Sequence, residues 1–198
     1  NNSLLIKSNK MKLLKYLFSI SIVFSSSFYF AQSTEIEDVK FDNIVNINGK
    51  STLLNGGGLR EKYGFMDLYV GGLYLVNKSA NDNEIVMADE NMGIRIVIVS
   101  GLVTRDRFIE ALEDGFKNTT AGKSTQEDVI KFKQFLSDPF IEGDEIVLNY
   151  HKSDAVYLYK NGEERGSFRG LEFKQALFGI WLGGNPADDD LKEGMLGL

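Results

Sequence analysis

Hydrophobic and polar positions alternate in several short segments of the chain, and this period of two predicts β-strands. The predicted strands are Ile44–Asn48, Leu53–Arg60, Phe65–Val76, Gly93–Ser100, Glu145–Tyr150, Ala155–Lys160 and Gly166–Arg169. Asn-Gly pairs at Asn48-Gly49 and Asn161-Gly162 are strong signals for tight turns between antiparallel strands. Gln32–Phe41 is polar and acidic, and we expect an extended lead-in there; Asn77–Asn83 is expected to be loop.

Other segments show the spacing of an amphipathic helix. Thr104 or Ser100 is expected to cap the first helix, and Ser124-Thr125-Gln126-Glu127 has the form of a capping box that opens the second. The expected inward residues are Phe108, Ile109, Leu112 and Phe116 in the first helix, and Val129, Ile130, Phe132, Phe135 and Leu136 in the second. Leu171–Leu182 is apolar nearly all round and is expected to be buried, and a short acidic helix, Ala187–Leu196, follows Asn185-Pro186.

The order of these elements is strands, two helices, strands and then helices. This order predicts an α+β fold in which an antiparallel β-sheet carries a layer of helices on one face, rather than a doubly wound sheet. We see no internal repeat and no linker, so residues 32–197 are expected to form a single domain.

The N-terminal residues have the pattern of a targeting segment. Met11 is the expected true start, which makes Asn1–Lys10 an upstream extension. A basic stretch with Lys12 and Lys15 is followed by an apolar run and then by small residues that end at Ala31, as in a signal peptide cleaved before Gln32. An uncleaved membrane anchor is the alternative, but the apolar run is short and rich in serine. We therefore expect export to the periplasm or beyond, with no stable membrane anchor after cleavage.

Charge and cysteine content exclude several classes of function. The chain has 22 basic and 28 acidic residues; four lysines and no acids lie in residues 1–31, so the mature chain carries a net charge of −10. Binding to nucleic acid needs clustered lysine and arginine, and we expect none. With no cysteine, disulfides, thiolate catalysis and thiolate metal sites are excluded.

Few residues point to catalysis, a metal or a cofactor. Neither Gly49-Lys50-Ser51 nor Gly122-Lys123-Ser124 has the earlier glycine of a phosphate-binding loop. The single histidine, His151, sits at a predicted strand end, where a catalytic triad is not favoured. The acidic run Asp188–Asp190 is explained by a helix N-terminus. We assign no catalytic residue, no metal ligand and no cofactor.

The most informative segment is Leu54–Leu75, LNGGGLREKYGFMDLYVGGLYL. Its three consecutive glycines, Gly56–Gly58, allow the backbone to bend, to bulge or to approach a ligand. The arginine that follows, Arg60, is either a solvated strand residue or an anchor for an anion, since a guanidinium offers five donors in a fixed fork.

This segment resembles the glycine-rich strand pair of the chalcone isomerase superfamily, in particular its bacterial chalcone isomerase-like branch. RFIEALEDGFKN (107–118) resembles the family's first helix, and GSFRGLEFKQALFGIWLGGNPADDDLKEGMLG (166–197) its closing helix pair. The resemblance spans about Asn43–Gly197. It implies an antiparallel sheet layered with helices, in the manner of an open-faced sandwich, and a ligand cleft between the two layers.

The resemblance also implies roles for single residues. Arg60 matches the arginine that holds the substrate's phenolate in the isomerases, and Tyr69 stands where they carry a threonine. Phe108 and Gly115 replace a tyrosine and an asparagine on the first helix, and a further serine or threonine falls near Ser167. Each missing donor of this kind costs about 10²–10³ in rate, so flavanone formation is not expected.

From this resemblance we expect a non-catalytic protein that binds a small amphipathic acid such as a fatty acid. Arg60 is expected to pair with the carboxylate, Tyr69 to donate its hydroxyl, and Phe108 to line the apolar part of the cleft. A chalcone isomerase-type intramolecular lyase is one alternative. The other is a structural or interaction module without a ligand, in which Arg60 pairs with Glu61 or Asp67.

Overall fold

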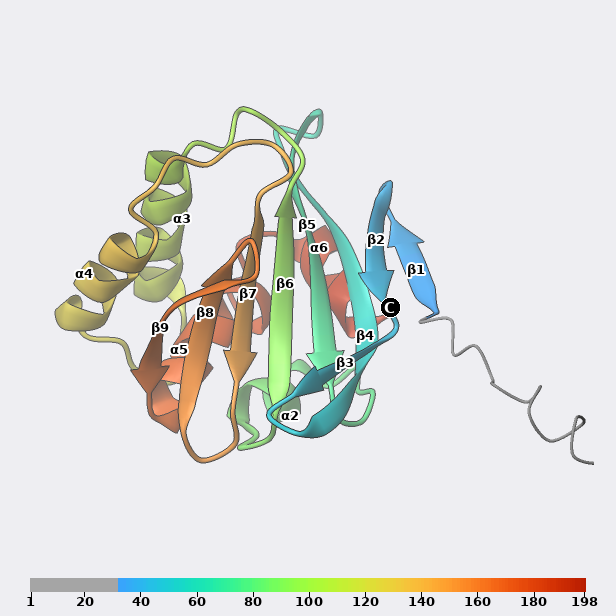
Figure 1. The fold of residues 1–198 in the computed structure, drawn as a ribbon, viewed down its shortest axis with the longest axis vertical. Helices are drawn as coiled ribbons and strands as arrows, with labels where there is room; N and C mark the ends of the chain where they lie inside the picture. The colour runs from blue at the N-terminus through green and yellow to red at the C-terminus, as the bar shows by residue number, and fades with distance from the viewer. Residues whose placement is uncertain (1–31) are drawn as a thin grey trace, which may run out of the picture. The chain divides into compact units, whose positions relative to one another are not determined.

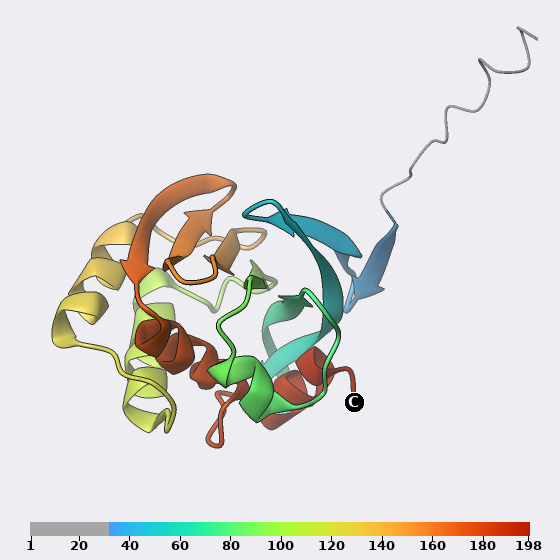
Figure 2. The same cartoon turned by 90° about the horizontal axis from the view of Figure 1, so that it is seen from below.

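The computed structural model describes residues 32–198, so the expected upstream extension and signal peptide lie outside the described residues. One sheet of seven strands forms the centre of the domain, and each strand pairs antiparallel with the next along the chain. The strands are β3 (Ile44–Ile47), β4 (Lys50–Lys62), β5 (Met66–Leu75), β6 (Met92–Ile98), β7 (Glu145–Tyr150), β8 (Ala155–Lys160) and β9 (Glu163–Arg169). The predicted α+β class is therefore confirmed, and Figures 1 and 2 show how the sheet curls.

Helices cover one face of this sheet, as the sequence predicted. They are α2 (Asp82–Met87), α3 (Arg105–Asn118), α4 (Gln126–Phe135), α5 (Leu171–Leu182) and α6 (Asp189–Leu196). In Figure 2, α2, α3, α5 and α6 lie on the same side of the strands. The central helix, α5, is buried along its whole length except its first two residues, because its apolar side chains face both the sheet and the neighbouring helices. Within residues 32–198, no helix is both long enough and apolar enough to cross a membrane.

The opposite face of the sheet carries a small hairpin that the sequence did not predict. Instead of an extended lead-in, β1 (Ser33–Ile36) and β2 (Val39–Asp42) pair antiparallel as a separate two-stranded sheet. Phe41 is fully buried and packs on Gly72, where an added Cβ would lie 2.6 Å from its ring. One aromatic side chain thus fixes a hairpin whose other residues are mostly polar and exposed.

The expected loop at Asn77–Asn83 also differs, since α2 begins at Asp82. This short helix is fixed from outside, by the buried Lys174 of α5. The Nζ of Lys174 donates hydrogen bonds of 2.8–2.9 Å to the carbonyl oxygens of Ile85, Val86 and Ala88. These carbonyls lie at the end of α2, where no helical N–H remains to satisfy them.

Two details of the helix predictions need correction. Thr104 caps α3 as expected, but the capping box of α4 lies one residue later than predicted, with Thr125 as the cap and Asp128 as its reciprocal partner. Ile130 is exposed rather than inward, because α4 packs at the edge of the domain on Phe132.

The glycine run serves helix packing. A Cβ on Gly56 would clash with the carbonyl oxygen of Gly194, and a Cβ on Gly194 would lie 2.6 Å from the carbonyl oxygen of Gly57. The backbone of α6 therefore rests directly on the backbone of β4. The expected bulge is present between Leu54 and Gly56.

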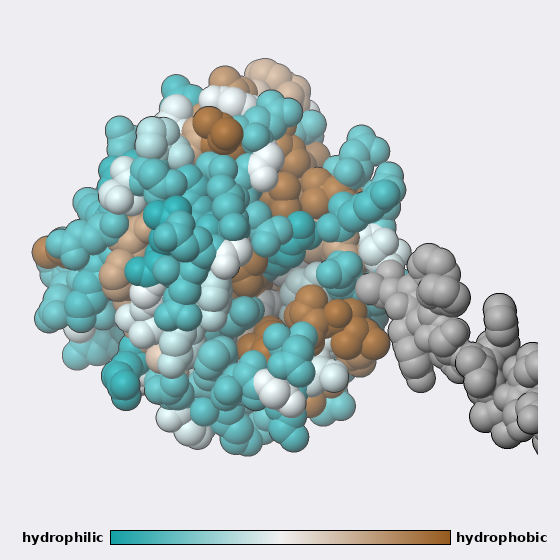
Figure 3. Space-filling view, viewed as in Figure 1, coloured by the Kyte–Doolittle hydropathy of each residue, from teal (hydrophilic) through white to brown (hydrophobic). Residues whose placement is uncertain are grey.

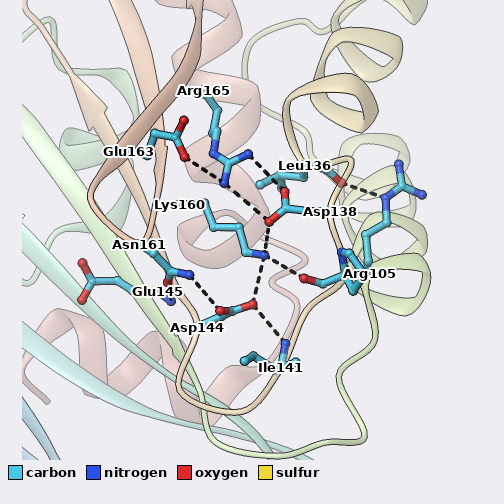
Figure 4. A network of polar contacts seen from close by, with 11 residues as sticks. Arg105, Leu136, Asp138, Ile141, Asp144, Glu145, Lys160, Asn161, Glu163 and Arg165 are labelled. Atoms are coloured by element: carbon cyan, nitrogen blue, oxygen red, sulfur yellow. Dashed lines mark hydrogen bonds and ion pairs between the residues drawn. The ribbon is translucent and has the colours of Figure 1, made fainter.

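A buried ion-pair network fixes the loop between α4 and β7 (Figure 4). Lys160 is 2% exposed, and its Nζ lies 2.6 Å from Asp138 Oδ2 and 3.0 Å from Asp144 Oδ2. It also donates to the carbonyl of Pro139, and it lies 4.8 Å from the ring centroid of Phe140. The network thereby holds Phe140 in place against the helix layer.

The two carboxylates of this network are held in their charged form. The hydrogen bond from Lys160 lowers the pKa of Asp138. Burial alone would raise the pKa of Asp144, but hydrogen bonds from Asn161, the Ile141 N–H and Lys160 outweigh it and lower the pKa.

Candidate ligand-binding site

Arg60 and Tyr69 are cross-strand partners on β4 and β5, and both side chains point to the helix-covered face of the sheet. The Nη1 of Arg60 donates to the Tyr69 hydroxyl at 3.4 Å, and its Cζ lies 5.5 Å from the centroid of the tyrosine ring. The register of the two strands therefore places a guanidinium beside a phenol at the end of the sheet.

The Tyr69 hydroxyl already accepts a second hydrogen bond. Trp181 of α5 donates its indole N–H to this oxygen at 2.8 Å. Arginine and tryptophan are donors only, so neither accepts the hydroxyl's own hydrogen. Within residues 32–198 no acceptor is recorded for that hydrogen. Tyr69, which is 2% exposed, thus keeps one donor unused next to a cation.

Phe108 completes the set from the helix side. It lies one turn into α3, and its side chain is buried. The centroid of its ring lies 6.4 Å from that of the Tyr69 ring and 5.2 Å from that of the Phe140 ring. The side-chain oxygen of Thr104 caps α3 by accepting a hydrogen bond from the Arg107 N–H, which fixes where the helix begins and so where Phe108 points. The structure therefore brings together all three residues that the sequence suggested.

These residues line a pocket of about 590 Å³ between the end of β4 and β5, α3 and the segment before α6. This volume is in the range of small-molecule sites. The other lining residues are Lys62, Tyr63, Met66, Leu68, Leu102, Val103, Arg107, Glu110, Ala111, Asp114, Gly115, Asn118, Asn185, Pro186 and Ala187. In the described part of the chain Arg60 forms no ion pair, so the pairing with Glu61 or Asp67 that belongs to the alternative of a structural module is not observed.

Gly115 also lines this pocket, at the place where the isomerases carry an asparagine. A Cβ there would lie 2.6 Å from Cγ2 of Ile180 on α5. The close packing of α3 on α5 therefore leaves no room at this position for a side chain that could donate a hydrogen bond. Ser167 does not contribute to the pocket, since it lies in β9 opposite Tyr157.

Trp181 is the residue that sequence reasoning missed. It lies on a helix that is apolar nearly all round, where a single aromatic side chain looks like ordinary core. A buried indole nevertheless needs an acceptor for its N–H, and that requirement was a usable signal. It did not indicate which element would supply the acceptor, because Tyr69 is 112 residues away.

The comparison with protein families decides which family the chain belongs to. A family model described as chalcone isomerase-like matches residues 33–197. The chain belongs to the chalcone isomerase-like family. A crystal structure of a fatty-acid binding protein from Arabidopsis thaliana is similar in fold, with a TM-score of 0.66, 21% identity, 83% of this chain and 96% of that chain covered. No curated protein sequence matches the chain.

Proposed function

We propose that this chalcone isomerase-like protein is a non-catalytic binding protein for a small amphipathic acid, of which a fatty acid is the simplest example. The observation that carries the proposal is the pairing of Arg60, which has no carboxylate partner in the described chain, with the unused hydroxyl hydrogen of Tyr69. A carboxylate is the group that would accept from both at once.

The apolar lining of the pocket supports the second half of the proposal. Leu68, Phe108 and Ala111 offer an apolar surface beside the two polar anchors. Each methylene removed from water contributes about 0.8 kcal/mol, so an alkyl chain would supply most of the affinity, and Arg60 would set its orientation. The structural likeness to a fatty-acid binding protein is consistent with this ligand class.

Two positions argue against the isomerase alternative. Phe108 has no polar group to donate to a substrate ketone, and the site at Gly115 has no room for a side chain next to Ile180. We expect no conversion of naringenin chalcone above the spontaneous rate, measured as loss of its absorbance.

Replacing Tyr69 by phenylalanine tests the ligand directly. The change removes one hydrogen-bond donor to a charged group and is expected to weaken the binding of a fluorescent fatty acid to delipidated protein by about tenfold. Tyr157→Phe removes a hydroxyl that bonds Asp154 outside the pocket and should leave the affinity unchanged. Equal affinity for wild type and Tyr69→Phe would argue against a carboxylate at this position.

The proposal places the protein outside the cytoplasm. Its support is the basic, apolar and small-residue sequence of residues 11–31. When the chain is expressed from Met11 in a bacterial host, the mature protein is expected in the periplasmic fraction with Gln32 at its N-terminus. Mass spectrometry of the intact protein checks this, and a chain that retains residues 11–31 would contradict it.

A further inference from the structure

The hairpin that joins β4 to β5 exposes two aromatic side chains. Tyr63 and Phe65 are each 74% exposed, and their ring centroids lie 6.5 Å apart. They belong to a three-residue loop between the paired residues Lys62 and Met66. Rings of this size are normally buried, because they carry much of the apolar area available to a core or an interface.

Tyr63 also occupies an unfavourable backbone conformation. Its φ of 61° lies in the left-handed region, which glycine and asparagine adopt far more readily than an aromatic residue. Gly64 follows with a φ of 70°. The chain therefore holds an aromatic ring where it costs folding free energy, and the exposed ring gains little burial in return.

The aromatic loop lies at the mouth of the ligand pocket. Lys62, Tyr63 and Met66 line the pocket, and so does Leu102, an exposed leucine of the loop between β6 and α3. Ile141, in the loop between α4 and β7, is also exposed, and the Gly143 N–H of that loop bonds the last residue of β6. In Figure 1 these three loops lie at the same end of the sheet, at the top, where Figure 3 shows apolar side chains at the surface. We call Tyr63, Phe65, Leu102 and Ile141 the apolar rim.

We propose that the apolar rim docks on the surface of a phospholipid bilayer and brings the pocket next to acids dissolved in it. The proposed binding to the bilayer is argued from the rim alone, whereas the transfer of an acid from the bilayer to the pocket rests on the function proposed above. The occupant follows from the size and shape of the rim. A stable protein interface buries about 800 Å² on each partner, whereas the rim consists of two rings and two aliphatic side chains on the tips of loops.

The chemistry of the rim suits the level of the lipid headgroups. Aromatic rings with a polar end are typical of this level, and lysines there extend toward water over an apolar stem. Lys62 Nζ lies 5.3 Å from the ring centroid of Tyr63, and Arg107 lines the pocket behind it. Glu61, Asp67 and Glu110 balance these cations nearby. The rings therefore supply the binding, and zwitterionic phosphatidylcholine should be sufficient.

The test measures co-sedimentation of ligand-free protein with phosphatidylcholine vesicles. The rim variant, Phe65→Ser combined with Ile141→Ser, changes the two rim residues that do not line the pocket. It is expected to weaken partition onto vesicles roughly tenfold or more, since two large apolar side chains no longer enter the interface. Both side chains are largely exposed, so the thermal midpoint should not fall. Ile44→Ser combined with Met87→Ser is the matched control, because both side chains are exposed and neither belongs to the rim.

The outcomes separate this proposal from the proposed ligand. The rim variant should bind a fluorescent fatty acid in solution as wild type does, while it takes the acid from vesicles about tenfold more slowly. The docking surface would be overturned if wild-type protein did not co-sediment with vesicles, even if the acid still binds. It would also be overturned if the control variant lost as much partition onto vesicles as the rim variant. Vesicle binding by a protein that binds no acid would leave the docking surface standing and refute the ligand.

Discussion

Replacing Arg60 by leucine is expected to weaken the binding of a fatty acid about 10- to 150-fold, which corresponds to the 1.5–3 kcal/mol typical of a hydrogen bond to a charged group. Arg60 lines the pocket and makes no ion pair within residues 32–198, so the proposed carboxylate would be its anionic partner. Leucine keeps the apolar contact of the side-chain stem while it removes the charge. Titration of delipidated protein with a fluorescent fatty acid measures the change.

A charge-matched control makes this result specific. Arg169→Leu changes the net charge by the same amount on a side chain that is 87% exposed and lies outside the pocket, and it should not affect the affinity. An alcohol with the same alkyl chain should bind wild type and Arg60→Leu alike, because it carries no carboxylate. An unchanged affinity of Arg60→Leu for the acid would defeat the proposed role of this arginine.

Replacing Lys160 by methionine is expected to lower the free energy of unfolding by about 3–5 kcal/mol, the typical cost of leaving a buried charge without its partner. Asp144 is buried and would lose the cation 3.0 Å from its carboxylate. Urea unfolding followed by circular dichroism measures the loss. Phe140, which packs on both Lys160 and Phe108, should become less well fixed, so the affinity for ligand should fall as well.

The acid dependence of stability provides a second readout for the same variant. The pKa values of Asp138 and Asp144 are lowered in the folded state, so their stabilisation is present above about pH 4 and is lost as the pH falls through the folded values. Without Lys160 this slope should be smaller. Lys152→Met, which breaks only an exposed pair with Glu90, should cost less than about 1 kcal/mol. Equal losses for the two variants would show that the buried network does not fix the fold.

The sequence predicted the seven strands of the sheet and four of the helices because their period and caps are local signals. Thr104 and the apolar stripe of α3 are examples. It missed the β1–β2 hairpin and α2, which depend on partners far along the chain. The hairpin is held by Phe41 on Gly72, and α2 by Lys174, which is 86 residues away from its partner Ala88. Neither partner leaves a mark in the local pattern.

The site shows the same division. Arg60, Tyr69 and Phe108 were found through a family resemblance, and the structure brings them to one pocket. The glycines beside Arg60 were expected to let the strand bend or bulge, or to admit a ligand. The bulge is present, but Gly56 leaves room for the backbone of α6, and Gly57 leaves room for the side chain of Ile36 in β1. A missing side chain shows that something approaches closely, but it cannot show what does.

The hydrogen bond between Trp181 and Tyr69 has a practical consequence. The chain contains one tryptophan, and its indole N–H contacts the hydroxyl that we expect the ligand to engage. When the light used for excitation is not absorbed by tyrosine, the emission of the protein therefore comes from this one indole next to the pocket. Occupancy can then be followed on unlabelled protein through the wavelength and intensity of that emission, with natural acids in place of dyes.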